Sequence, residues 1–375
     1  MRLYIAGGCQ EHGRNSFLLE LPEYSILVDC GKKEGDAEPN PKLNTEQIRR
    51  IRYLFLTHSH KDHTGAVPWL IQQGFSGTIL SAEETRVQMG VSYENWIVLP
   101  GAEGCASYQM DDMEIQYGKS GHCVGSIWIL LKLAKKKILF TGDYSEQSVF
   151  YQCDRIRDFF ADCAVMDCAY GNRSILAETA VHELQEALAR ASMERRTLLL
   201  PVPKYGRGMD FLSVIKWYHR ASEVYGDAEL CEQAQSEQGW KWSSLHLQES
   251  SRKVTSERSQ MMKRIEDWNG EPAVLLIADP QLRKGKNQRL VKEILHCGGK
   301  LLLSGHLYPD TYAEKVWKAG YAEKIAYPVH QTYADVCTLV QKNQFSKIVL
   351  NHSEETIDDR MGVAVPCKTG DAIVF

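Results

Sequence analysis

The chain has 375 residues, of which 43% are hydrophobic and 25% are charged, an ordinary composition for a globular enzyme or binding protein. This length is too great for one small core and favours a large domain with a second domain inserted in it. The formal net charge of −4 excludes a generally basic surface, so a nucleic acid would have to be bound locally.

Hydrophobic patterning in the first third of the chain predicts strands that alternate with short helices. Two apolar, β-prone segments, residues 16–21 and 24–29, are separated by Pro22-Glu23, which indicates a hairpin. The other predicted elements are a short helix from about residue 44, a buried strand at 53–57, a helix at 66–73 that ends at Gly74, and strands at 126–133 and 137–141.

From about Gly171 the pattern changes to longer helices between buried strands. The predicted strands lie at 197–202, 273–278 and 300–304, with helices at about 181–191 and 288–295 and an exposed polar stretch at 229–259. This alternation predicts a second α/β unit with its own parallel sheet. A helix at 333–342 and a strand at 347–350 follow it.

Potential metal ligands are concentrated directly after the predicted strand at 53–57. His58, His60, Asp62 and His63 lie within six residues, and imidazole with carboxylate is a ligand set that suits zinc. Because His58 and His60 are two residues apart, an extended turn points both side chains to the same side. A histidine-rich solvent loop is the alternative interpretation of this stretch.

Two further candidate ligands lie next to other predicted strands. His122 precedes the strand at 126–133, and Asp143 follows the strand at 137–141. Either residue alone is a weak signal, because a single histidine is more often a core or surface residue. Together with the first cluster, they predict one shared metal site.

The motif His58-x-His60-x-Asp62-His63, followed by His122 and Asp143, resembles the signature of the metallo-β-lactamase fold in order and spacing. The resemblance implies an α/β protein with an αββα sandwich and a metal site at one edge of its two sheets. It also implies that His58, His60 and His122 hold a first zinc ion. Asp62 and His63 would then hold a second zinc ion, with Asp143 bridging the pair.

Later segments resemble the motifs of the β-CASP family of RNA- and DNA-processing nucleases. These segments are Val165–Arg173 with Asp167, Leu200–Arg207, Tyr327–His330 followed by Ala334-Asp335, and Ile348–Glu354 with His352. The chain departs from the family pattern in two places. Asp167, Cys168 and Ala169 stand where the family usually has glutamate, serine and threonine, and Ser353 stands where it has glycine.

This second resemblance divides the chain and assigns further roles. It implies a metallo-β-lactamase domain at residues 1–171, an inserted α/β β-CASP domain at 172–312, and a return segment at 313–375 that completes the first domain. His352 would be a ligand of the second zinc ion. His330 would lie beside the scissile phosphate, where Asp167 would orient it through a hydrogen bond.

The function that the resemblance implies is a zinc-dependent phosphodiesterase. Two zinc ions, about 3.5–4 Å apart, would activate a hydroxide that attacks phosphorus, with manganese as the alternative metal. Asp62, His330 and Asp167 are the expected catalytic residues. A histidine at the position of His352 is typical of RNA-cutting members and a valine of DNA-cutting members, so we expect a ribonuclease that binds RNA, with DNA as the alternative substrate.

The residues that bind the substrate are harder to predict. Arg207 suits a phosphate or a carboxylate, and Lys284 and Lys286 belong to a short basic loop that could contact a phosphate backbone. A structural ion pair for Arg207 and a solvated loop for the lysines are the alternatives. Trp240 and Trp242 could stack on bases, although core packing or a partner surface is the favoured interpretation.

Two other function classes are open. A small-molecule metallo-hydrolase, such as a thioesterase or a lactamase, would not need the inserted domain or the pair of Asp167 and His330. A catalytically silent scaffold would be expected to have lost metal ligands, whereas here every predicted ligand position is filled. Longer family members carry additional C-terminal domains, so we expect a homo-oligomer or a protein partner to contribute to substrate binding.

The remaining features concern location. No apolar stretch approaches the roughly 18 residues of a membrane-spanning helix, and the first residues lack the pattern of a signal peptide. The 11 cysteines are scattered without a C-x-x-C pair, which indicates reduced thiols. We therefore expect a cytoplasmic protein with no membrane partner.

Overall fold

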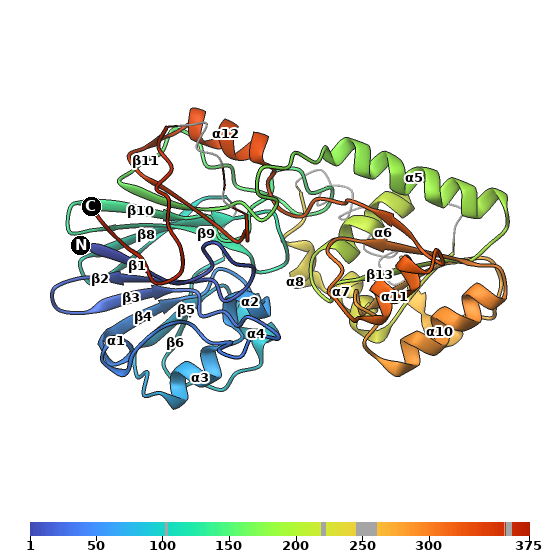
Figure 1. The fold of residues 1–375 in the computed structure, drawn as a ribbon, viewed down its shortest axis with the longest axis horizontal. Helices are drawn as coiled ribbons and strands as arrows, with labels where there is room; N and C mark the ends of the chain where they lie inside the picture. Colours follow the sequence, from blue (N-terminus) through green and yellow to red (C-terminus); the bar gives the residue numbers. More distant parts are fainter. Residues whose placement is uncertain (102–103, 219–222, 245–260, 356, 358–361) are drawn as a thin grey trace. The chain divides into compact units, whose positions relative to one another are not determined.

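The computed structural model describes residues 1–101, 104–218, 223–244, 261–355, 357 and 362–375. The chain forms two compact units (Figure 1). Unit 1 consists of Met1–Glu146, Gln152–Ser174 and His330–Phe375, and unit 2 consists of Gln147–Tyr151 and Ile175–Val329. In the described ranges, no helix combines the length and the apolar character needed to cross a membrane.

Unit 1 is built on two sheets. The first has the strand order β21-β1-β2-β3-β4-β5-β6 and the second has the order β20-β12-β10-β9-β8-β7. The strands of the first sheet are β1 (Arg2–Gly7), β2 (Ser16–Glu20), β3 (Ser25–Val28), β4 (Ile51–Phe55), β5 (Thr78–Ser81), β6 (Trp96–Val98) and β21 (Ala372–Val374). The strands of the second are β7 (Ala106–Met110), β8 (Met113–Lys119), β9 (Ile127–Leu133), β10 (Lys136–Phe140), β12 (Cys163–Asp167) and β20 (Ile348–Asn351).

The central strands of both sheets of unit 1 are buried on two faces, because each sheet is covered on both sides. Phe17 of β2 meets Phe140 of β10 with ring centroids 6.3 Å apart, so the inner faces of the sheets contact each other. On the outer face of the first sheet, Leu18 belongs to a buried cluster with Val67 and Leu70 of helix α3. The helices of unit 1 are α1 (Thr45–Arg50), α2 (Lys61–Thr64), α3 (Val67–Gln72), α4 (Glu83–Met89) and α12 (Tyr333–Gln341).

Helix α12 covers the outer face of the second sheet. Its residues Val336 and Leu339 belong to one buried cluster with Leu130 of β9 and Leu139 of β10. A small sheet of β11 (Phe160–Ala161) and β19 (Gln344–Phe345) lies in the same part of the chain. The order helix, sheet, sheet, helix confirms the predicted αββα sandwich (Figure 1).

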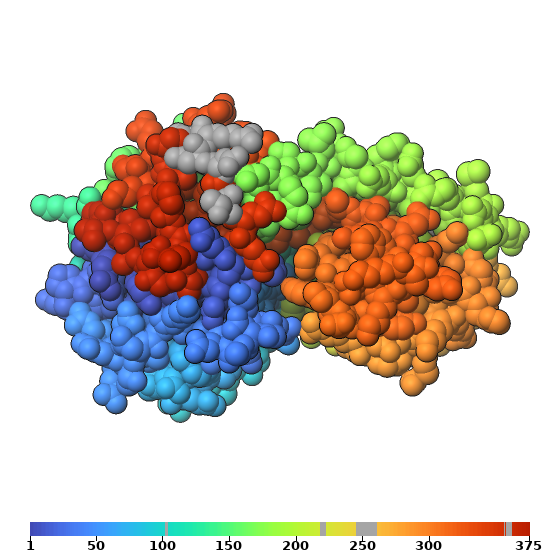
Figure 2. Space-filling view, in the orientation of Figure 1, coloured from blue at the N-terminus to red at the C-terminus, as the bar shows by residue number. Residues whose placement is uncertain are grey.

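The two ends of the chain meet in unit 1. Strand β21 pairs antiparallel with β1, with Leu3 opposite Ile373. Figure 2 shows C-terminal residues, in red, next to N-terminal residues, in blue, on this face. The segment that follows β20 also contacts the loop that follows β1, because the backbone N–H of His352 donates to the carbonyl of Gly8 at 2.7 Å.

Unit 2 contains a parallel sheet with the order β15-β14-β16-β13-β17-β18, which confirms the predicted second α/β unit. Its strands are β13 (Leu198–Val202), β14 (Val224–Gly226), β15 (Lys263–Arg264), β16 (Val274–Ala278), β17 (Lys300–Ser304) and β18 (Glu323–Ile325). Its helices are α5 (Ala177–Met193), α6 (Arg207–Tyr218), α7 (Ala228–Gln235), α8 (Glu237–Trp240), α10 (Gly285–His296) and α11 (Tyr312–Lys318).

Two predictions for this part of the chain need correction. The return to unit 1 occurs at His330 instead of residue 313, because α11 and β18 still belong to unit 2, where β18 pairs with β17. The stretch at 229–259 is not uniformly exposed: residues 229–244 carry α7 and α8 with buried Leu230, Cys231 and Ala234, and residues 245–259 lie outside the described residues. The spacing of these apolar residues is helical, but polar neighbours hide it.

Candidate metal centre

The loop that follows β4 is held by a buried aspartate at the end of β3. Asp29 accepts hydrogen bonds from the backbone N–H and the hydroxyl of Thr57, both at 2.8 Å. His58 follows Thr57 and is fully buried, and the chain then turns into the short helix α2, which starts after His60. This anchoring places the imidazoles of the motif on a rigid backbone at the end of the sheet.

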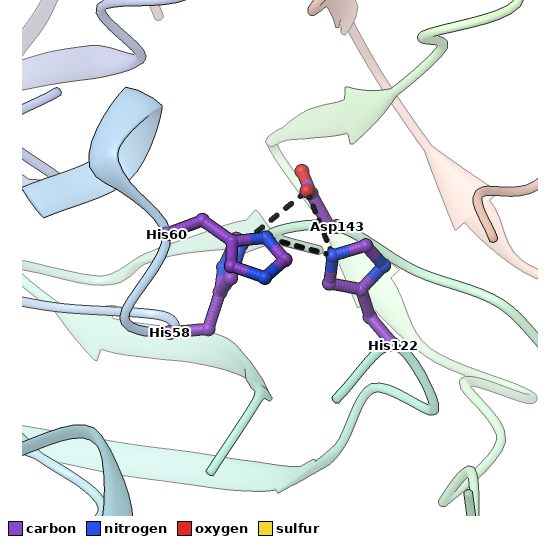
Figure 3. A group of neighbouring side chains, drawn as sticks. All are labelled: His58, His60, His122 and Asp143. Carbon is purple, nitrogen blue, oxygen red and sulfur yellow. Dashed lines mark hydrogen bonds and ion pairs between the residues drawn. The ribbon is translucent and has the colours of Figure 1, made fainter. Parts of the chain in front are cut away.

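The first group of candidate ligands consists of three histidines and one aspartate. Each of His58, His60, His122 and Asp143 offers one ligand atom, and these atoms lie within 4.8 Å of one another. Nε2 of His122 is 3.1 Å from Nδ1 of His60, and Oδ2 of Asp143 is 3.3 Å from Nε2 of both His58 and His122. Figure 3 shows the three rings turned toward one another with the carboxylate beside them.

A second group shares Asp143 with the first. It consists of Asp143, Asp167, His330 and His352, whose ligand atoms again lie within 4.8 Å of one another. Oδ1 of Asp143 is 3.2 Å from Nδ1 of His352, while Nδ1 of His330 is 2.9 Å from Oδ2 of Asp167. Asp143 therefore lies where the two groups meet.

The two remaining predicted ligands face this second group. Nε2 of His63 is 3.0 Å from Oδ1 of Asp143, and Oδ2 of Asp62 is 3.0 Å from Nε2 of His352. The structure thus brings together every residue that the sequence proposed as a ligand, from loops that follow β4, β8, β10 and β20.

Unsatisfied polar atoms test whether these residues fit a metal ion. Among the described residues, Nε2 of His58, Oδ1 of Asp143 and both ring nitrogens of His352 are buried without a hydrogen bond. Leaving such atoms unpaired is costly, and native proteins normally satisfy them. Imidazole nitrogens and carboxylate oxygens in this number are a donor set that suits divalent cations, so the residues fit.

Burial and neighbouring charges prepare these groups for binding a cation. Burial, reinforced by His58, lowers the pKa of His60 to about 4, and burial holds the pKa of His122 well below its usual value. Burial alone would raise the pKa of Asp143, but the nearby imidazoles of His63 and His352 outweigh it and hold this pKa well below its usual range. His60, His122 and Asp143 are therefore in the forms that bind metals, a neutral imidazole or an ionised carboxylate. The neighbouring carboxylates, Asp143 first, instead raise the pKa of His63 and His352 against the effect of burial, so these two rings would release a proton when they bind an ion.

Comparison with known proteins agrees with this geometry. Residues 10–167 match the model of the metallo-beta-lactamase superfamily. The chain contains a metallo-β-lactamase domain. The predicted recognition is thereby confirmed, and the candidate ligands His58, His60, His122 and Asp143 all lie inside the matched residues.

Two relatives extend the match beyond this metallo-β-lactamase domain. The RNase J-like protein of Methanocaldococcus jannaschii is 21% identical over 94% of this chain and 92% of its own length. The transcription termination factor FttA of Methanosarcina mazei is 25% identical, but the match covers 58% of this chain and only 39% of that protein. A crystal structure of a protein of unknown function from Enterococcus faecalis V583 has the same fold, with a TM-score of 0.63, 11% identity, and coverage of 100% of this chain and 99% of that one.

Two polar residues that contact His63 lie outside every motif that predicted the site. Asp29 lies 2.7 Å from Nδ1 of His63, and the side-chain nitrogen of Asn15 lies 3.0 Å from Nε2 of the same ring. Asn351 in turn donates to Asn15 at 3.0 Å. The one signal for Asp29 in the sequence was that it directly follows an apolar strand, just as Asp143 follows another apolar strand.

The three predicted substrate-binding residues lie in unit 2. Arg207 is only 7% exposed and donates to the hydroxyl of Ser304 at 3.1 Å, which favours its structural interpretation. Nζ of Lys284 lies 3.7 Å from Glu229, and Lys286 is exposed on the first turn of α10. Trp240 and Trp242 are buried, as the core-packing interpretation predicted.

Proposed function

We propose that this chain is a metal-dependent ribonuclease that hydrolyses phosphodiester bonds of RNA with two zinc ions. The observation that carries the proposal is the convergence of the predicted ligands on Asp143, with the pair of His330 and Asp167 directly beside it. The name of the RNase J-like relative, whose match spans nearly the whole chain, supports RNA as the substrate. On this proposal, residues 175–329 of unit 2 form most of the β-CASP domain.

The ligand assignment follows from the two groups. His58, His60 and His122 would hold the first ion, and Asp62, His63 and His352 the second, with Asp143 between them. Zinc is the metal that this donor set favours, and manganese is the alternative. Divalent ions held there would lower the pKa of a water molecule and neutralise charge that develops on the phosphate.

His330 and Asp167 form the part of the site that handles protons. The carboxylate of Asp167 accepts from Nδ1 of His330 at 2.9 Å, which fixes the ring and leaves Nε2 as the atom for proton transfer. The backbone N–H of Tyr144 also donates to Asp167, at 3.1 Å, so the carboxylate is itself held. We assign to His330 the donation of a proton to the leaving oxygen.

Cleavage of end-labelled oligonucleotides tests the proposal. The metal-loaded protein should cleave RNA to products with a 5′-phosphate. His58→Ala should abolish cleavage because it removes a ligand of the first ion, and Asp143→Ala because it removes the ligand that lies between the two ions. His182→Ala is the control, since His182 is 70% exposed on helix α5. Equal cleavage of DNA would indicate the DNA nuclease instead, and turnover of a thioester without cleavage of either polymer would indicate a small-molecule hydrolase.

A further inference from the structure

A third group of metal-ligating side chains lies beside the proposed pair of ions. His12, Asp62 and His352 each offer one ligand atom within 4.8 Å of the others. His12 belongs to the loop between β1 and β2, outside every motif that predicted the site. We propose that His12 is a further protein ligand of the second divalent ion, an inference that rests on the proposed function.

The two nitrogens of His352 indicate where that ion would lie. Nδ1 is 3.2 Å from Asp143 and 3.6 Å from Asp167, whereas Nε2 is 3.0 Å from Asp62. An imidazole that binds a metal through one nitrogen usually donates its other N–H to a carboxylate. Nδ1 of His352 faces the carboxylates of Asp143 and Asp167, and Nε2 faces Asp62, the side on which the second ion would lie.

The two ring nitrogens of His63 also face different partners. Its Nδ1 lies 2.7 Å from the carboxylate of Asp29, and its Nε2 is directed toward Asp62, at 3.8 Å, and Asp143, at 3.0 Å. The second ion thus has Asp62, His63 and His352 as ligands on one side. His12 approaches Asp62 and His352 from the loop that follows β1.

The spacing of the ligand atoms of His12, Asp62 and His352 suits a shared ion, and the His12 ring also contacts His352. This ring lies parallel to the ring of His352, with a centroid distance of 4.9 Å and an interplanar angle of 9°. With His12, the second ion would have five protein ligands, a coordination number that zinc also adopts in catalytic sites, and bonds of about 2.1 Å would then hold neighbouring ligand atoms roughly 3.0–3.4 Å apart. Because His12 and Asp62 are both partly exposed, their side chains have room to rotate and bring their ligand atoms closer together.

Several buried contacts hold the loop that carries His12. Glu11 and Arg14 form a buried ion pair at 2.8 Å, with both side chains 7% exposed, and Glu11 also accepts from the backbone of Gly8 at 3.1 Å. The backbone N–H of His352 donates to the carbonyl of Gly8 at 2.7 Å. This hydrogen bond ties the loop that carries His12 to His352, which would bind the same ion.

Stacking on His352 is the alternative role for His12, and two substitutions separate the roles. His12→Phe keeps an aromatic ring against His352 but has no nitrogen, whereas His12→Ala removes both. If His12 is a metal ligand, both variants lose that ligand. If His12 only stacks on His352, the alanine variant alone loses the contact.

The experiment uses the full chain, stripped with a chelator and titrated with Zn²⁺ and with Co²⁺. We expect two ions per wild-type chain by elemental analysis. In both His12 variants the second ion should bind at least about tenfold more weakly in competition with a chelator, with an altered Co²⁺ absorption spectrum. Gln10→Asn is the control, because Gln10 is exposed in the same loop and asparagine tolerates its φ of 53°.

Three outcomes would overturn the inference. Wild-type affinity in both variants would exclude His12 as a ligand while leaving the proposed function intact. Wild-type affinity in His12→Phe alone would assign His12 to stacking. A wild-type chain that binds no divalent ion would overturn the proposed function itself, and this inference with it.

Discussion

At the scale of single residues, the candidate site contains unusual backbone conformations. Asp29 has a φ of 60° and His352 a φ of 72°, a left-handed region that residues other than glycine rarely adopt. Such conformations persist only where surrounding contacts hold them, and they are frequent at functional sites. Here the contacts are present: Asp29 holds Thr57 and His63, and the backbone of His352 donates to Gly8.

His330 is the residue whose loss should affect chemistry without affecting metal binding. We expect His330→Ala to keep both ions and to slow cleavage by about 10²–10⁴-fold, the usual contribution of a general acid. Asp167→Asn should slow it by about 10–100-fold, since it only loosens the orientation of His330. Single-turnover rates together with elemental analysis check both. Wild-type rates in the alanine variant would mean that His330 has no part in proton transfer.

The residues of the site differ in how far the sequence could predict them. His58, His60, Asp62 and His63 were predictable because polar, metal-ligating side chains rarely cluster directly after a buried strand. Asp29, Asn15 and His12 were not, because a single polar residue near a strand end is common. Their roles depend on contacts between segments far apart in the chain, such as Asn15 with Asn351, which no local pattern encodes.

At the scale of elements, strands buried on both faces were the most predictable. The hairpin expected at residues 16–29 is present as antiparallel β2 and β3, and the helix at 66–73 is present as α3 (Val67–Gln72). Helices α7 and α8 were not predicted, because their few apolar residues are separated by polar ones. Local patterns also could not predict which sheet a strand joins, because strand pairing depends on contacts between segments far apart in the chain.

Helix α12 shows how an element supports the site. It begins three residues after His330, and Thr332 caps it in a capping box with Asp335, whose carboxylate accepts from the backbone of Thr332 at 2.8 Å. We expect Thr332→Ala to lower the free energy of unfolding by about 1 kcal/mol, since it removes a cap. Urea unfolding measures this. Thr338→Ala, an exposed position in the same helix, is the control, and an equal loss there would contradict a specific capping effect.

At the scale of the whole molecule, the two compact units are interleaved in sequence. The short segment Gln147–Tyr151 belongs to unit 2, although its neighbours on both sides belong to unit 1. Asp210 of α6 holds this segment, because it accepts from the hydroxyl of Ser148 at 2.7 Å and from the backbone N–H of Phe150 at 2.8 Å. A prediction that divides the chain into consecutive ranges cannot contain such a segment.

Asp210 should also give unit 2 a measurable pH dependence. Burial raises its pKa from 3.8 to about 6, even though Ser148, Phe150 and Arg207 oppose this shift. An acid whose pKa is higher in the folded state binds more protons there than in the unfolded state. The free energy of unfolding should therefore fall as the pH rises from about 4 to about 6, and this contribution should be constant above pH 6.

Replacing Asp210 by asparagine isolates this contribution from that of the metal ligands. Urea unfolding of both proteins in the presence of a chelator gives the difference in stability at each pH. Because one pKa unit corresponds to about 1.4 kcal/mol, that difference should shift by about 2–3 kcal/mol in favour of Asp210→Asn between pH 4 and pH 6. Asparagine retains a side-chain oxygen for Ser148 and Phe150, so the variant keeps the tie to the segment. Parallel stability curves over this range would show that the carboxylate of Asp210 is ionised at little cost, and that the segment Gln147–Tyr151 is held mainly by other contacts.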